Sequence, residues 1–376
     1  MNWLIFKKFI QAQAIFAGTV IGVGLFGLPY AASQIGFWPL AIYFTLLSPL
    51  VIVVHFLLGE IACGTDKLAR VPGYAGEYLG RRMKKISFVV SALGILGALL
   101  AYLIVGGQFF YAVLSPFFGG SPLVYTLIFF SAGTILIYKG VKSISYIELV
   151  LFIIFIFILG LFFYFALPFF NVQNFSSINL QFLILPYGVV IFSLWGTSVI
   201  PEIKEIISGD RRLLRWIIAT GSILIALIYL FFVIIILSVT GSNTSREAIS
   251  GFASIVGPKV VFWGFCFGLI TTFTSFLTIG LTLKRIFNYD FKVNHRLSWA
   301  IACFTPLVLF IIGFNNFIDV IGLTGAIALG AEGIIIIFIY RAYLERKGLK
   351  MSVWFYSLVI FLIFGILAEF FVFFSR

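Results

Sequence analysis

The sequence predicts an all-α integral membrane protein with eleven transmembrane helices, and three observations carry this prediction. Of the 376 residues, 62% are hydrophobic and 10% are charged, whereas soluble domains carry about 25% charged residues. The apolar runs are continuous rather than alternating, and each reaches or approaches the roughly 20 residues that a helix needs to cross hydrocarbon. Lys and Arg are concentrated in alternate loops, which is typical of multi-pass helical proteins.

The predicted spans follow one another through short loops, so residues 1–376 are expected to form a single transmembrane domain. The longest connections, 64–85 and 241–257, are each expected to hold a short helix at the membrane surface. The spans are expected at residues 11–33, 36–63, 86–113, 121–138, 145–168, 183–207, 213–240, 258–287, 296–313, 317–340 and 352–374.

The distribution of basic residues predicts the orientation. With the N-terminus inside, 22 of the 25 Lys and Arg residues fall in inner segments. This asymmetry agrees with the positive-inside rule, and one span more or fewer would destroy it. We therefore expect a multi-pass protein of the cell membrane (plasma or inner membrane) with a cytoplasmic N-terminus and an external C-terminus.

The first predicted span is interrupted by the run GTVIGVGLFGLP at residues 18–29, which holds four glycines and a proline. Within a helix, glycine costs about 1 kcal/mol and proline about 3 kcal/mol relative to alanine. A loosened helix is tolerated in the membrane only where its backbone is buried in protein or lines a cavity. Two interpretations remain open here, namely close helix packing through small residues and a binding site in a discontinuous helix.

A second interruption, FSLWGTSVIPE at residues 192–202, lies in the sixth span. Gly24 precedes Pro29 by five residues, and Gly196 precedes Pro201 by the same distance. Matched interruptions in two halves favour the binding-site interpretation and predict an internal repeat. Repeat one covers about 11–168, repeat two about 183–340, and 352–374 is an extra span. Because each repeat holds five spans, the second is expected to be inverted.

Composition argues against several other classes of protein. The net charge of +12 does not indicate nucleic-acid binding, because the charges follow the membrane-flanking loops. Cys63, Cys266 and Cys303 lie in or at the ends of spans and form no disulfide framework. His55 and Glu60 are five residues apart, about 140° around a helix, so they do not share a face. Without convergent His, Cys, Asp or Glu side chains, we expect no enzyme, no cofactor and no obligate protein partner, only membrane lipid and a substrate.

The two interrupted runs and the eleven spans resemble the amino acid/auxin permease-type family of amino acid transporters, which includes bacterial tyrosine and tryptophan permeases and eukaryotic neutral amino acid symporters. This family is similar to the larger group that shares the LeuT fold. The resemblance covers nearly the whole chain. It implies a 5+5 inverted repeat, spans 1 and 6 broken at the midplane, and a trailing span 11.

An amino acid substrate presents a carboxylate and an ammonium group to the breaks. Free N–H groups and the positive end of a half-helix suit the carboxylate, and glycines allow close backbone approach. Carbonyl groups of the second break suit the ammonium. Aromatic neighbours would set side-chain specificity, although each could equally be a core or lipid-facing residue. The expected substrate-binding residues are Thr19, Val20, Gly22, Val23, Gly24, Tyr102, Phe192, Ser193, Leu194 and Trp195.

The resemblance also implies a sodium site between spans 1 and 8. Its ligands would be the carbonyls of Gly18, Ile21 and Thr271 and the hydroxyls of Thr274 and Ser275. Some sodium-independent relatives carry a lysine in span 5, whereas residues 149–167 contain none. The hydroxyl-rich face of span 8 could instead serve close packing against a neighbouring helix, and this alternative stays open. We expect sodium as a co-substrate, with proton coupling left open.

Glu332 lies near the centre of the tenth span, where a charged carboxylate costs roughly 2.5–3.5 kcal/mol. Gly322, Gly325 and Ala328 share its side of the helix. We therefore expect Glu332 to point into the bundle, to be largely protonated and to donate a hydrogen bond. It is either a structural tie between spans or a proton-coupling group.

These observations favour a secondary active symporter for a neutral amino acid, an aromatic one among the candidates, coupled to sodium. The alternatives are a proton-coupled amino acid permease and a transporter-like nutrient sensor. The sequence singles out neither the amino acid nor an oligomeric state.

Overall fold

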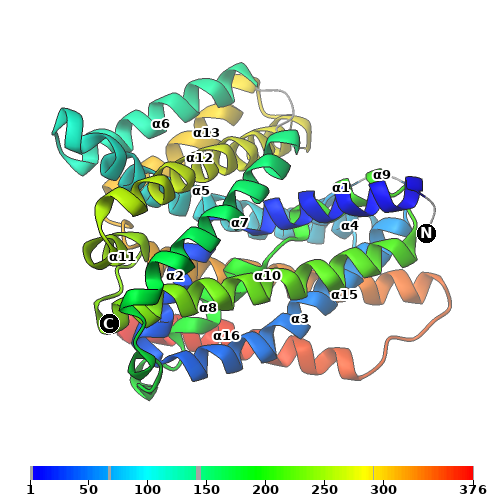
Figure 1. Ribbon diagram of the computed structural model, residues 1–376. Coiled ribbons are helices and arrows are strands. Elements are labelled where there is room, and N and C mark those ends of the chain that lie inside the picture. Colours follow the sequence, from blue (N-terminus) through cyan, green and yellow to red (C-terminus); the bar gives the residue numbers. More distant parts are fainter. Residues whose placement is uncertain (1–2, 67–68, 141–144, 291, 376) are drawn as a thin grey trace.

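The structure is a computed structural model that describes residues 3–66, 69–140, 145–290 and 292–375. Every regular element within these ranges is a helix. Most of the long helices run side by side, and the N- and C-termini lie at opposite ends of the bundle (Figure 1). Termini on opposite sides are what an odd number of crossings requires.

The helices fall into two groups, those within the first predicted repeat and those that follow it. The helices of the first part are α1 (Trp3–Val20), α2 (Gly24–Ile35), α3 (Phe37–Cys63), α4 (Val71–Tyr78), α5 (Arg81–Phe118), α6 (Pro122–Lys139) and α7 (Ser145–Ala166). Those of the second part are α8 (Leu185–Leu194), α9 (Ile200–Ile206), α10 (Arg211–Thr240), α11 (Ile249–Val256), α12 (Pro258–Arg285), α13 (His295–Ile311), α14 (Phe317–Leu323), α15 (Gly330–Arg346) and α16 (Trp354–Ser375).

Short tight or widened turns connect several of these helices. Single 3₁₀ turns are η1 (Leu167–Phe169), η2 (Val172–Phe175), η3 (Leu180–Phe182), η4 (Thr197–Val199) and η5 (Gly241–Asn243). Two π-helical turns are η6 (Ile286–Asp290) and η7 (Thr324–Leu329). The tenth predicted span therefore consists of α14, η7 and α15, a π-turn that the apolar pattern of residues 317–340 did not predict.

Among the described residues, eight helices are long and apolar enough to cross a membrane, and the bent pair α1–α2 adds a ninth. Helix α13 is apolar but spans 17 residues. The sixth predicted span is divided into α8, with 10 residues, and α9, with 7 residues. The chain is thus a multi-pass membrane protein.

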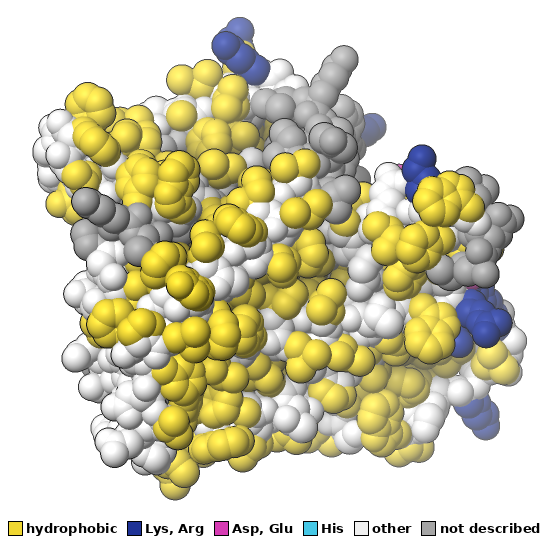
Figure 2. All heavy atoms as spheres, in the orientation of Figure 1, with side chains coloured by type: hydrophobic (Ala, Val, Ile, Leu, Met, Phe, Trp, Pro, Cys, Tyr) yellow, Lys and Arg dark blue, Asp and Glu magenta, His cyan; other side chains and the backbone are white. Residues whose placement is uncertain are grey.

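The surface has the character expected in lipid. Figure 2 shows a face covered by apolar side chains, with the visible Lys and Arg residues at its upper and right-hand margins. The right-hand margin is the end of the bundle that holds the N-terminus (Figure 1). Basic residues at the edge of an apolar belt are typical of membrane interfaces.

Glycines set the close approach of α8 to α14 and η7. A Cβ on Gly188 of α8 would overlap the carbonyl oxygen of Gly322, and a Cβ on Gly325 would overlap that of Gly188. Small residues allow helix backbones to meet in this way. The contact fixes α8 against α14 and η7, and it places the second break beside the start of α15.

Candidate functional site

The first break separates α1 from α2 at residues 21–23, where the chain bends by 56°. The Ile21 amide still donates to Ala17 O over 2.8 Å, but the Gly22 amide donates only two residues back, to Val20 O, over 2.8 Å. The Val23 side chain does not cap α2. Because the first N–H groups of a helix have no acceptor within it, the start of α2 offers amide donors inside the bundle.

The second break lies between α8 and η4. Trp195 is extended, and the chain re-enters a helical turn at Thr197. The Gly196 amide donates to His55 Nε2 over 3.0 Å, and His55 is fully buried in α3. Only a neutral imidazole can accept through Nε2. A side chain of the second span therefore supplies the acceptor that regular helix geometry no longer provides.

The two breaks lie against each other. A Cβ on Gly24 would come within 2.6 Å of Ser193 Oγ and 2.8 Å of Ser193 Cα. A Cβ on Gly196 would come within 2.6 Å of a Val20 methyl group. Glycine is needed at position 24 because the Ser193 backbone lies directly against it, and at position 196 a Cβ would displace the packed Val20 side chain.

One side chain from α10 connects both breaks. Tyr229 Oη donates to Val20 O over 2.8 Å and lies 3.0 Å from Ser193 O. A tyrosine hydroxyl has a single proton, so the two carbonyls share it. Tyr229 is fully buried. Its hydroxyl therefore satisfies backbone oxygens that the two broken helices leave without regular partners.

Glu332 accepts hydrogen bonds from two side chains of the second break and from Ser91 of α5. Ser91 Oγ donates to Oε1 over 2.6 Å, and Trp195 Nε1 and Thr197 Oγ1 each donate to Oε2 over 2.8 Å. Glu332 is 7% exposed and lies directly after the π-turn η7. Since an indole N–H can only donate, Oε2 must accept from Trp195; in a protonated carboxyl the hydroxyl pair with Ser91 or the one with Thr197 could be reversed.

The expected substrate-binding residues divide into two groups. A Cβ on Gly22 would overlap the Tyr102 hydroxyl, and one on Gly24 would come within 3.1 Å of the Phe192 ring. The structure thus brings Tyr102, Gly22, Gly24, Phe192 and Ser193 to the meeting point of the breaks.

The remaining members point elsewhere. The Trp195 ring packs edge-on to His55 with centroids 6.0 Å apart and turns towards Glu332. Val20, Val23 and Leu194 are buried in the apolar core, and Thr19 is half-buried on α1. These side chains pack around the breaks and do not face the expected substrate. Their backbone groups still belong to the broken segments.

The five expected sodium ligands line one small cavity of about 30 Å³. Gly18 and Ile21 reach it from the end of α1, and Thr271, Thr274 and Ser275 reach it from α12. Its other wall consists of Leu151, Phe152 and Phe155 of α7 with Phe267. About 30 Å³ is the share of volume that one water molecule takes in the liquid, so the cavity suits a single small ion or a water molecule.

The hydroxyl groups at this cavity are oriented by their own helix. Thr274 Oγ1 donates to Thr271 O over 3.0 Å. The hydroxyl proton is therefore directed along α12, and the oxygen lone pairs remain available as ligands. Neutral oxygens from an unwound half-helix end are the groups that coordinate cations in broken-helix transporters.

Sequence reasoning missed three residues of this site, namely Tyr229, His55 as a partner of Gly196, and Ser91. Tyr229 is one of 16 tyrosines, and nothing in its neighbourhood distinguishes it from a core residue. His55 carried one signal, since a histidine inside a span is a functional candidate by default. Ser91 is one small polar residue of the third predicted span, and the sequence gives no sign of its distant partner.

Comparison with known proteins adds the following findings. A profile of the tryptophan/tyrosine permease family matches residues 6–372. Tyrosine-specific transport system 1 of Haemophilus influenzae is 25% identical over 391 residues, covering 96% of this chain and 95% of that protein.

Solved structures show the same fold. MhsT in complex with L-phenylalanine has a TM-score of 0.69 at 15% identity and covers 96% of this chain and 98% of that chain. Inward-facing Mhp1 has a TM-score of 0.70 at 13% identity, covering 92% and 78%. A manganese transporter of Eremococcus coleocola has a TM-score of 0.63 at 13% identity, covering 97% and 85%. At these identities the likeness concerns the fold, which is the LeuT fold.

Proposed function

The chain belongs to the tryptophan/tyrosine permease family, and from this premise we propose that it is a secondary active transporter that carries an aromatic amino acid in symport with sodium. It is a permease and not an enzyme. The observation that carries the proposal is the direct contact between the two breaks, where Gly24 faces Ser193 and Tyr229 joins both carbonyl ends. Broken helices that meet inside a bundle are the typical substrate site of such transporters.

In this proposal the start of α2 holds the substrate carboxylate. The amides of Val23 and Gly24 and the positive end of α2 supply the binding energy, because the amides of Ile21 and Gly22, expected to contribute as well, already donate to Ala17 O and Val20 O. Tyr102 lies over Gly22 at the same place. The carbonyls of residues 192–195 receive the ammonium. The Phe192 ring, half-buried beside Gly24, contacts the aromatic side chain of the substrate.

Sodium is proposed for the cavity between α1 and α12. Its five oxygens are neutral, and the part of α7 that faces it contributes only apolar side chains. A cation at this cavity would tie the end of α1 to α12. Ion binding would thereby fix the position of α1, the first half of span 1. The end of α1 lies directly beside the amides proposed to bind the substrate.

We further propose the topology that the sequence predicts. Eleven spans form one domain with a 5+5 inverted repeat and an extra span, in the cell membrane with the N-terminus in the cytoplasm. The bent pair α1–α2, the divided span of α8 and α9, and the positions of the termini support it.

A second candidate function is proton-coupled transport by the same site. The observation that favours it is Glu332, a buried carboxyl group hydrogen-bonded to Trp195 and Thr197 of the second break. A proton on this carboxyl would change the hydrogen bonding of that break directly. The two candidates therefore differ in the ion and share the substrate site.

Uptake by proteoliposomes tests both candidates. Radiolabelled tyrosine, tryptophan and phenylalanine are offered under an inward sodium gradient, under an inward proton gradient, and under neither. Accumulation driven by sodium alone supports the proposal, and accumulation driven by protons alone replaces it with the second candidate. Specific binding of an amino acid without uptake under any gradient would favour the sensor alternative.

A further inference from the structure

A basic groove lies apart from the substrate and ion sites, at the end of the bundle that holds the N-terminus. It has a volume of about 650 Å³ and lies between the end of α3 and the start of α10. The hydrogen bond from Lys8 to Ser208, over 2.9 Å, places the start of α10 beside the beginning of α1. The residues that line the groove and matter here are Phe56, Glu60, Arg211, Arg212, Arg215 and Trp216.

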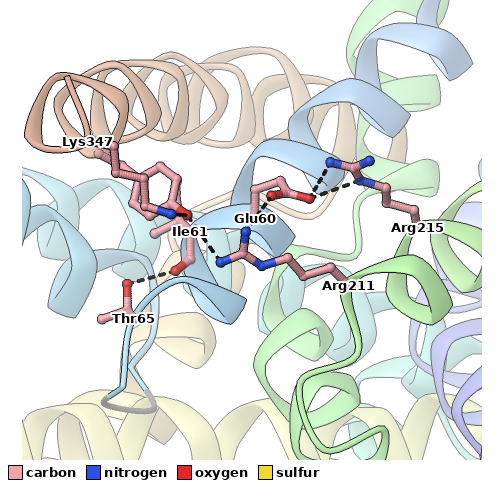
Figure 3. Close-up of polar contacts among 7 residues, drawn as sticks. Glu60, Ile61, Thr65, Arg211, Arg215 and Lys347 are labelled. Carbon is pink, nitrogen blue, oxygen red and sulfur yellow. Dashed lines mark hydrogen bonds and ion pairs between the residues drawn. The ribbon is translucent and has the colours of Figure 1, made fainter. Parts of the chain in front are cut away.

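Three arginines in this groove face one carboxylate. Arg215 pairs with Glu60 at 2.7 Å, and Arg211 pairs with the same carboxylate at 3.7 Å (Figure 3). Arg212 is exposed and has no hydrogen bond or ion pair to any residue that the structure describes. The groove therefore carries an excess of two positive charges, and one guanidinium is free to bind a ligand.

The arginines lie at the start of α10, where Asp210 caps the helix and Glu60 pairs with Arg211 and Arg215. Arg211, Arg212 and Arg215 occupy the first turns of the helix, where the macrodipole is positive and acidic residues are preferred. An anion in the groove would interact favourably with both the arginines and the helix start. Guanidinium groups match phosphate oxygens in geometry and can bind them in pairs.

The groove continues into an apolar track. Phe56 is half-buried and Trp216 is 58% exposed. Ile223 and Leu227 are exposed further along α10. Ile223 lies seven residues after Trp216, and Leu227 lies four residues after Ile223, which keeps the three on one face. Tryptophan is enriched at the level of lipid headgroups. A ligand that matches both parts has a phosphate headgroup and acyl chains.

We propose that this groove binds an anionic phospholipid of the leaflet on the side of the N-terminus. The phosphodiester contacts Arg212 and Arg215, and an acyl chain lies along Trp216, Ile223 and Leu227. Basic pockets between transmembrane helices bind lipid headgroups in this way. Because Arg211 also contacts Tyr343 of α15 at 3.5 Å, the bound lipid would stabilise the junction of α3, α10 and α15.

Native mass spectrometry of the purified full chain tests the proposal. The protein is delipidated in detergent and titrated with phosphatidylglycerol or with phosphatidylcholine, which carries the same phosphate but no net charge. We expect wild-type protein to retain phosphatidylglycerol with at least about tenfold higher affinity, and Arg212→Gln to lose most of this preference. Arg341→Gln is the matched control, because Arg341 is exposed on α15 outside the groove.

Two further arms separate the possible outcomes. Inorganic phosphate in excess should not displace the lipid, because it lacks acyl chains; displacement would mean a free-anion site and overturn the proposal. Melting temperatures with and without phosphatidylglycerol give a second readout. Since Arg212 has no partner in the described chain, Arg212→Gln should fold normally and lose only the lipid-induced stabilisation. Equal retention of both lipids, or equal binding by Arg212→Gln and wild type, contradicts the assignment.

Discussion

The hydroxyl of Tyr229 lies 2.8 Å from the carbonyl oxygen of Val20, so the seventh predicted span reaches the last residue of α1. The same hydroxyl lies 3.0 Å from Ser193 O in the second break. It therefore holds two carbonyls from opposite halves of the chain with one proton. A substrate ammonium group would donate hydrogen bonds to carbonyls of this kind. The Tyr229 hydroxyl is a neutral donor to the same kind of group.

Tyr229→Phe should destabilise the protein, because Ser193 O loses the Tyr229 hydroxyl and Val20 O keeps only the Gly22 amide as a donor. We expect the free energy of unfolding to fall by about 1–3 kcal/mol, seen as a lower melting temperature in detergent. Tyr187→Phe is the matched control, since the Tyr187 hydroxyl is buried without a hydrogen-bond partner among the described residues. Equal melting temperatures of the two variants would show that the Tyr229 hydrogen bonds contribute nothing.

Gly24→Val should abolish uptake while leaving the protein in the membrane. The new side chain would meet Ser193 Oγ at 2.6 Å and Ser193 Cα at 2.8 Å, and a backbone atom cannot move aside as a flexible side chain can. Gly22→Val should act similarly through Tyr102. The control is Gly160→Val on α7, where a Cβ meets nothing within 4 Å. Normal substrate affinity of Gly24→Val would contradict a substrate site at this break.

The sequence predicts the parts of this structure that arise from local chemistry. Apolar runs predict where long helices lie, and the Gly and Pro residues of 18–29 predict a break that the structure places at residues 21–23. The alignment of spans 1 and 8 implied by family resemblance places Gly18 and Thr271 near each other, and both line one cavity in the structure. Each of these features depends on a short stretch of chain or on a pattern shared with relatives.

The partners of the break depend instead on contacts between distant residues. Ser91 and Glu332 are 241 positions apart, and His55 and Gly196 are 141 apart. Their pairing follows from the packing of whole helices, which no single window of sequence describes. The π-turn at Thr324–Leu329 also escapes prediction, because its apolar residues have the same composition as a regular helix.

Thr274→Ala combined with Ser275→Ala should weaken the sodium dependence of uptake. The change removes two of the five proposed oxygen ligands, and we expect the sodium concentration for half-maximal uptake to rise roughly tenfold or more, about 1.4 kcal/mol of binding free energy. Thr272→Ala is the control, because this buried hydroxyl donates to Gly268 O and does not line the cavity. Wild-type uptake that ignores sodium and follows a pH gradient would refute the sodium assignment.

Substitution of Glu332 should separate a structural role from a titrating one. In Glu332→Gln the amide oxygen can accept from Trp195 and Thr197, while the amide NH₂ donates to the Ser91 hydroxyl, which can also accept. This variant should fold as the wild type does. Glu332→Ala leaves all three donors without an acceptor, and each buried donor left unpaired costs about 1–3 kcal/mol, so its melting temperature should fall.

The decisive measurement for Glu332 is the pH profile of uptake. Glu332→Gln resembles a permanently protonated carboxyl, so a transporter that uses this proton should lose the pH dependence of its uptake while still exchanging substrate. Glu247→Gln is the control, because Glu247 is also 7% exposed but accepts from Ser245 and Ser250 at the start of α11. If Glu332→Gln transports with the pH profile of the wild type, the carboxyl only ties Ser91 to the second break, because its hydrogen bonds then survive without a titratable group.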